Sequence, residues 1–276
     1  MRAAAQVPAV KGVPAPVAGG TAPAQAQAIA QALLAGERKA ILLGNAAAHH
    51  GHAAQLLALA QWIGEQTGAT VGYLTEAANT VGAQWVQAQP QKDGKNAGEM
   101  LTGAIKAAIL LNTEPAFDAA AGAKGLEQAD MVITLSPFKA NLDISDVLLP
   151  VAPFTETSGT FVNAEGRVQS FHAVVKPLGE TRPAWKVLRV LANLLELPGF
   201  DYESSQDVLT AAIGAETKEV PSALRSNITK VAAKVPENEA AEPVTASIYQ
   251  LDGIVRRATS LQLTADARLA REGGAA

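Results

Sequence analysis

The stretch FTETSGTFVNAEGRVQ, residues 154–169, concentrates side chains that could do chemistry. Its two carboxylates, Glu156 and Glu165, could act as a general acid and a general base. Glycines, hydroxyls and Arg167 could instead hold an anionic ligand. The same letters also fit a β-hairpin, because Asn163 to Gly166 suits a type I turn with a left-handed glycine at its end. The residues alone leave the hairpin, the ligand clasp and the acid–base pair open.

A second candidate is GNAAAHHGH, where Gly44 and Asn45 follow a predicted strand and precede a helix. Backbone amides at such a junction can bind phosphate. The glycine fingerprint of dinucleotide-binding proteins is absent, however. The imidazoles of His49, His50 and His52 are metal ligands by type, yet no acidic residue or cysteine lies near them in the sequence. We therefore expect a solvated helix start and no metal site.

Short apolar runs alternate with helical segments along most of the chain. This pattern predicts an α/β fold, with a Rossmann-like, mostly parallel sheet and helices on both of its faces. In such folds ligands bind beyond the carboxyl ends of the strands. The predicted strands are 39–44, 69–74, 106–112, 130–136 and 146–150, and the predicted helices are 21–36, 52–68, 181–199 and 206–213, with Thr21 and Thr181 as helix caps.

The chain divides by composition into four parts. Residues 1–20 read as a disordered Ala/Pro-rich leader, and 21–215 as the α/β domain with its β-hairpin. Residues 216–245 are polar and are expected to form a linker. Apolar residues return in 246–276, which we expect to be a helical or extended tail that docks on this domain or on a partner.

The composition excludes several classes of function. The sequence has no cysteine, so it holds no disulfide and no cysteine-ligated zinc or iron–sulfur site. The net charge is −4 and no basic cluster is present, so nucleic acid is not an expected partner. No apolar stretch reaches the length of a membrane span, and no signal-peptide pattern is visible. We expect a cytoplasmic protein without direct membrane insertion.

Four segments together resemble the molybdopterin oxidoreductase superfamily. They are ILLGN with HH shortly after it, ADMVITLSPF, ISDVLLPVAPFTETSGTFVNAEGRVQ and GETRPAWKVLRVLANLL. Within the superfamily, APFTETSGTFVNAEGRVQSF and GETRPAWKVLRVL are most similar to the C-terminal region of the large peripheral-arm subunit of bacterial NADH-quinone oxidoreductase (respiratory complex I). The resemblance covers residues 31–202 and, more loosely, 247–264.

This resemblance implies a non-catalytic scaffold in the peripheral arm of that complex, peripheral to the inner membrane, with other peripheral-arm subunits as partners. Electrons from NADH would pass to quinone through iron–sulfur clusters outside this chain, which would hold no cofactor itself. Residues that match family motifs would be structural or the remains of a nucleotide site. They are Gly44, Asn45, Glu156, Gly159, Thr160, Asn163, Glu165, Gly166 and Arg167.

Two other functions stay open. The chain could be the pterin-guanine-dinucleotide-binding domain of a molybdenum or tungsten enzyme, such as a formate dehydrogenase or nitrate reductase. Amides near Gly44 and Gly159 would then hold phosphates of the molybdopterin guanine dinucleotide, and Arg167 or Arg182 would add positive charge. An NAD-dependent dehydrogenase is the weaker alternative, favoured only by Glu76 near the end of the second predicted strand.

Overall fold

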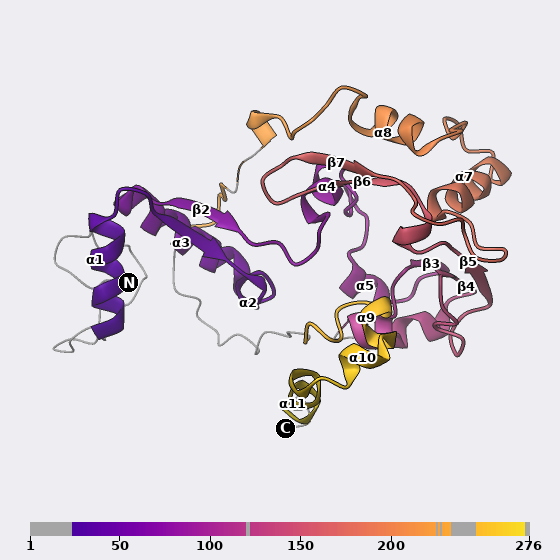
Figure 1. The fold of residues 1–276 in the computed structure, drawn as a ribbon, viewed down its shortest axis with the longest axis horizontal. Coiled ribbons are helices and arrows are strands. Elements are labelled where there is room, and N and C mark those ends of the chain that lie inside the picture. Colours follow the sequence, from indigo (N-terminus) through magenta and orange to yellow (C-terminus); the bar gives the residue numbers. More distant parts are fainter. Residues whose placement is uncertain (1–23, 120–121, 225, 227, 233–246, 274–276) are drawn as a thin grey trace. The chain divides into compact units, whose positions relative to one another are not determined.

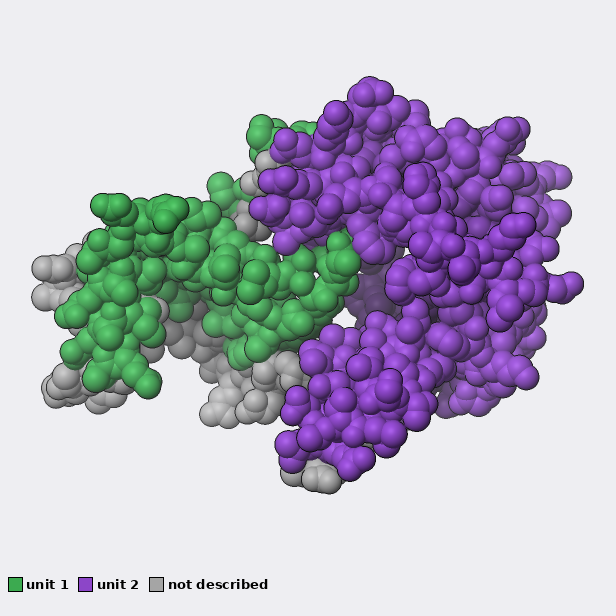
Figure 2. Space-filling model, viewed as in Figure 1, with its two compact units in different colours: residues 1–80, 221–245 green, residues 81–220, 246–276 purple. Residues whose placement is uncertain are grey.

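The computed structural model describes residues 24–119, 122–224, 226, 228–232 and 247–273. Contacts divide the chain into two compact units, which Figure 1 traces as a ribbon and Figure 2 colours separately. Unit 1 comprises residues 1–80 and 221–245, and unit 2 comprises residues 81–220 and 246–276. The predicted leader, the Thr21 cap and residues 233–245 of the predicted linker lie outside the described residues.

Unit 1 contains a two-stranded parallel sheet with a helix packed on it. Gly64 allows α3 to approach β2, since a Cβ at this position would lie 2.8 Å from Val71 Cγ2. Gly68, at φ 71°, ends α3 in the left-handed conformation expected of a helix C-terminus. The elements are α1 (Ala24–Ala35), β1 (Ala40–Leu43), α2 (Asn45–Ala48), α3 (Ala53–Thr67), β2 (Thr70–Tyr73) and the short 3-10 helix η3 (Ser222–Leu224).

Unit 2 is built on a three-stranded parallel sheet in the order β3-β4-β5. Side chains alternate between the faces of a strand, so Leu110 of β3 and Val132 of β4 reach the core that they share with Leu126. The Asp146 carboxylate accepts a 2.7 Å hydrogen bond from the Val132 amide and ties the start of β5 to β4. The elements are α4 (Thr80–Trp85), α5 (Ala97–Thr102), β3 (Ala107–Leu111), α6 (Pro115–Asp118), η1 (Lys124–Gln128), β4 (Met131–Ser136) and β5 (Val147–Pro150).

An antiparallel hairpin and two helices follow in unit 2. The hairpin gains a further bridge, because the Val168 amide donates to Lys218 O within the predicted linker. Thr181 does not cap the next helix as predicted, since its hydroxyl donates to Leu178 O. These elements are η2 (Phe154–Glu156), β6 (Gly159–Val162), β7 (Val168–Phe171), α7 (Ala184–Leu194) and α8 (Ser205–Ile213).

The C-terminal segment of unit 2 is helical. It forms α9 (Gly253–Arg257), α10 (Thr259–Gln262) and α11 (Ala265–Gly273). The Asp252 carboxylate caps α9 by accepting hydrogen bonds from the amides of Ile254 and Val255. Among the helices of the described residues, none combines the length and the apolar character needed to cross a bilayer.

These elements confirm the predicted α/β class, with parallel strands, flanking helices, a β-hairpin and a helical C-terminal segment. The five parallel strands fall near their predicted positions. They hydrogen-bond as two separate sheets, however, whereas the sequence predicts one. Periodicity identifies a strand but does not say which neighbour it pairs with, and that explains the difference. The predicted domain boundaries stay a prediction.

Candidate functional site

The hairpin turn satisfies its own polar groups. The Gly166 amide donates to Asn163 O over 2.9 Å, and Gly166 has φ 86°, which confirms the predicted turn with a left-handed glycine. The Asn163 side chain accepts hydrogen bonds from the amides of Glu165 and Arg167, both at 3.0 Å. Glu165 and Arg167 form an exposed ion pair of 3.1 Å. Four of the predicted site residues thus have roles in making the turn.

The other predicted site residues of this stretch also have local contacts. Glu156 accepts a 2.8 Å hydrogen bond from the Leu178 amide, and Thr160 shares a hydrogen bond with the Ser170 hydroxyl. A Cβ on Gly159 would lie 2.7 Å from the ring of Phe171, so glycine lets this ring pack against β6 in its present position. Each carboxylate has a partner of its own, which gives no support to an acid–base pair. Whether these residues are remains of a nucleotide site stays a prediction.

The remaining predicted site residues lie in unit 1. Gly44 follows β1, and Asn45 begins the four-residue helix α2. A Cβ on Gly44 would meet nothing within 4 Å, so open space lies beside the carboxyl end of β1. His49 Nε2 contacts the Glu76 carboxylate, which joins the loops that follow β1 and β2.

The described contacts of the three histidines do not bring them together as one set of ligands. His49 contacts Glu76, whereas His50 and His52 contact each other. His50 Nδ1 accepts a 3.0 Å hydrogen bond from the His52 amide. Within the part of the chain that the structure describes, no group of three or more His, Cys, Asp or Glu side chains is placed to hold a metal ion. Glu76 is engaged by His49, at the position where a dinucleotide-binding domain would offer an acidic residue to a ribose.

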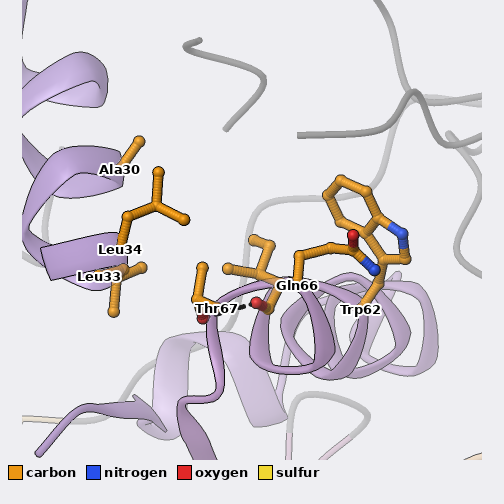
Figure 3. A pocket seen from close by; sticks show the side chains of 7 residues that line it. Ala30, Leu33, Leu34, Trp62, Gln66 and Thr67 are labelled. Carbon is orange, nitrogen blue, oxygen red and sulfur yellow. Dashed lines mark hydrogen bonds between the residues drawn. The ribbon is translucent and has the colours of Figure 1, made fainter. Parts of the chain in front are cut away.

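Figure 3 shows a pocket in unit 1 between α1 and α3. The Thr67 hydroxyl donates a 2.7 Å hydrogen bond to Ile63 O of its own helix and is therefore engaged. The walls come from helices and not from strand ends, so this pocket is not the ligand crevice that the sequence predicts. The lining residues are Ala30, Leu33, Leu34, Trp62, Ile63, Gln66 and Thr67.

The carboxyl end of β3 in unit 2 carries a cluster of charged side chains. Glu114 directly precedes α6 and Asp118 ends it, whereas Arg256 and Arg257 come from α9. Arg257 binds Glu114 through two parallel hydrogen bonds of 2.8 Å each. Arg256 reaches Asp118 at 2.7 Å and Glu114 at 3.1 Å. We call these four residues the arginine–carboxylate cluster.

Two of the four side chains are withdrawn from solvent, whereas Asp118 and Arg257 are partly exposed. The exposed fraction of the side chain is 7% for Arg256 and 11% for Glu114. The hydrogen bond from Arg257 lowers the pKa of the Glu114 carboxyl below its ordinary value, against the opposing effect of burial. The guanidinium carbon of Arg256 also lies 5.1 Å from the centre of the Phe117 ring, and that of Arg257 lies 4.4 Å from the centre of the Phe138 ring.

A second layer of polar groups holds the end of β3 in place. The Asn112 amide donates to Leu135 O and extends the β3–β4 ladder by one residue. The Asn141 side-chain amide donates to Thr113 O at 2.9 Å. The Asp118 carboxylate accepts a 2.6 Å hydrogen bond from the Glu114 amide, which orients both acids of the cluster. At the end of β3, one of the strand ends where ligands are expected, these acids are thus engaged by the chain's own side chains.

The sequence pattern does not reveal this cluster. It predicts that the loop after β3 faces a ligand crevice, but nothing links this loop to a pair of arginines more than a hundred positions away. The available signals are the acids of TEPAFD directly after a strand and the adjacent arginines of DGIVRR after a capping aspartate.

Comparison with known proteins gives two results. The profile of the molybdopterin oxidoreductase family matches residues 22–194, which is more than half of the chain. A Staphylococcus aureus (strain bovine RF122) protein named as a formate dehydrogenase is 39% identical over 77 residues, which cover 28% of this chain and 8% of that protein. The oxidoreductase YjgC of Bacillus subtilis (strain 168) is 40% identical over 70 residues, which cover 25% of this chain and 7% of that protein.

The chain therefore spans only about a twelfth of the length of the curated relatives that it matches. Their names describe proteins that are far longer than the matched segment. The family match is broader, because it begins before α1 and extends to the end of α7. On this match, the chain belongs to the molybdopterin oxidoreductase family.

Proposed function

We propose that this chain is a non-catalytic scaffold domain of a larger oxidoreductase. The electron-carrying centres would be held by polypeptide outside this chain. The observation that carries the proposal is the arginine–carboxylate cluster, which fills the carboxyl end of β3 with the chain's own side chains. The hairpin supports it, because its polar groups serve the turn and the neighbouring backbone. The sequence also lacks the cysteines that iron–sulfur clusters require.

The hairpin and α7 motifs resemble those of the large peripheral-arm subunit of NADH-quinone oxidoreductase, so the peripheral arm is the assembly that we propose. The chain would contribute packing surface there, and NADH-to-quinone electron transfer would run through partner polypeptides. Attachment to the membrane would be indirect, through the complex.

Affinity purification of the tagged full chain from detergent-solubilised membranes of its host tests this assignment. The expected result is co-purification of other NADH-quinone oxidoreductase subunits in stoichiometric amounts, identified by mass spectrometry. A chain with a scrambled segment 154–169 serves as the control for non-specific capture. Recovery of the chain without any respiratory subunit would refute the peripheral-arm assignment.

The relatives favour a second candidate, the dinucleotide-binding domain of a formate dehydrogenase-like enzyme. The described residues fit its pterin guanine dinucleotide only in part. Gly44 offers open space at the end of β1, but Gly159 faces the Phe171 ring, and Arg167 is paired with Glu165. Arg182 is exposed and donates to Thr181 O next to it. Within unit 2, Gly159, Arg167 and Arg182 thus each have a local contact of their own.

The molybdenum content of the same purified material separates the two candidates. The scaffold proposal expects no molybdenum beyond the background that the untagged host gives, measured by inductively coupled plasma mass spectrometry. A stoichiometric amount of molybdenum, together with formate-dependent dye reduction, would select the second candidate.

A further inference from the structure

We infer that the end of β3 is a receptor site for guanidinium groups, and that segment 252–262 is its exchangeable plug. This inference is independent of the assembly in which the chain works. It concerns the place in unit 2 where Glu114, Asp118, Phe117 and Phe138 contact Arg256 and Arg257 of the chain's own C-terminal segment. We call the side formed by the two acids and the two rings the recess. When this segment leaves, the recess would be open to another ligand with the same chemistry.

The receptor side combines two carboxylates with two aromatic rings. Both oxygens of Glu114 and one oxygen of Asp118 accept hydrogen bonds from the arginines. The second oxygen of Asp118 accepts from the Glu114 amide, which orients the two acids. Phe117 and Phe138 place ring faces next to the two guanidinium groups. Carboxylates bind the planar guanidinium fork through paired hydrogen bonds, and aromatic faces stabilise it further. An ammonium group would use this arrangement less well.

The plug side is shaped to enter the recess. A Cβ on Gly253 would lie 2.9 Å from Glu114 Oε1, so glycine allows the start of α9 to come this close. Asp252 caps α9 and thereby sets the direction of the two arginines that follow. Gln262 of α10 donates to Tyr249 O and to Val255 O, which folds the segment onto itself. The segment therefore has contacts of its own that can persist outside the recess.

One buried donor of the plug lacks a hydrogen-bond partner. Arg256 Nε is buried and has no hydrogen-bond partner among the described residues. The side chain is only 7% exposed, so water has little access to this atom. A buried donor without a partner costs free energy that release to water regains. This cost weakens the hold of the plug and favours its release.

The test uses the full chain and a synthetic peptide of residues 247–264 with a fluorescent label. A chain with R256A and R257A should bind this peptide about tenfold or more tightly than the wild-type chain, because its own segment no longer competes from within the same molecule. A chain with R268A, an exposed arginine of α11, should behave as the wild type. Equal binding by all three chains, measured by fluorescence anisotropy, would overturn the inference.

Two further measurements test whether the arginines are what the site recognises, and the second uses the wild-type chain so that it does not depend on the folding of a variant. A peptide with both arginines replaced by alanine should not bind the double variant, and equal binding of this peptide would overturn the inference. In the wild-type chain, an excess of isotopically heavy peptide should raise deuterium uptake of the amides of α9. Unchanged uptake at millimolar peptide would show that the plug does not exchange, and that result also overturns the inference.

Discussion

The hairpin of β6 and β7 and the arginine–carboxylate cluster both join acids to arginines, but over very different separations along the chain. In the hairpin, Glu165 and Arg167 are two positions apart, and their side chains are 69% and 68% exposed. In the cluster, Glu114 and Arg257 are 143 positions apart, and their side chains are 11% and 35% exposed. The residues of the first pair lie within one short stretch of the sequence, whereas those of the second are brought together only by the fold.

The comparison teaches what a dense polar stretch in a sequence indicates. Neighbouring polar residues can satisfy each other while the chain turns, so their density reflects local backbone needs. Charges brought together from distant segments must leave water to meet, and they stay buried only if they are well paired. The buried pair therefore constrains the position of α9, whereas the exposed pair constrains very little.

The largest expected effect comes from Glu114→Ala. It leaves the buried guanidinium group of Arg256 and the partly exposed one of Arg257 without their shared partner. We expect a loss of about 3 kcal/mol in the free energy of unfolding. Urea denaturation of the full chain, followed by circular dichroism, measures it. The exposed Glu127→Ala serves as the matched control. A loss as small as that of the control would mean that the cluster does not stabilise unit 2.

Lowering the pH should have the next largest effect, because it neutralises Glu114 without removing its side chain. The folded state lowers the pKa of Glu114 below its ordinary value of 4.5. The stabilisation is thus complete above pH 4.5 and is lost as the pH falls through the lowered pKa. The wild type should lose more stability than E114Q between pH 5 and pH 3. If the free energy of unfolding of the two proteins falls in parallel with pH, Glu114 is not the group whose titration destabilises the fold.

A smaller effect is expected from Gly166→Ala in the hairpin. At φ 86° a Cβ is strained, and we expect a cost of about 1–2 kcal/mol. Gly166→Asn should cost less, because asparagine tolerates left-handed backbone better. Deuterium uptake of the amides of β6 and β7 reports the local opening. Equal uptake in both variants and the wild type would show that the turn does not depend on glycine.

The smallest effect belongs to Glu165→Ala. This side chain pairs with Arg167 in solvent, so its loss should change the free energy of unfolding by less than about 0.5 kcal/mol. The salt dependence of that small change should be measurable by urea denaturation in low and high sodium chloride. A loss near that of Glu114→Ala would show that the exposed hairpin pair stabilises the fold as much as the arginine–carboxylate cluster does.

Local features of the fold could be predicted from the sequence, because they depend on residues that are close in the chain. The strands, the helix that ends at Gly68 and the turn at Gly166 are all recognisable from apolar runs and glycine positions. The cap assigned to Thr181 is wrong because its hydroxyl donates to a competing carbonyl in the preceding turn. Hydroxyl side chains often have this choice, and the sequence does not decide it.

The arrangement of distant segments could not be predicted in this way. Strand pairing and the meeting of α6 with α9 depend on the path of the chain, which no local pattern encodes. The predicted site residues illustrate the same point, since Gly44 and Asn45 lie in one unit and Glu156 to Arg167 lie in the other. Shared family motifs place them in one set, although each group has separate local contacts.

We propose that this chain supports an oxidoreductase assembly without holding the family's dinucleotide itself. The most direct test is to purify the intact assembly through a tag on this chain, isolate the chain from it without denaturation, and then heat it and quantify released GMP by mass spectrometry. For a scaffold domain we expect less than about a tenth of a mole of GMP per mole of chain, the level of adventitious nucleotide. One mole or more of GMP per mole of chain would contradict it.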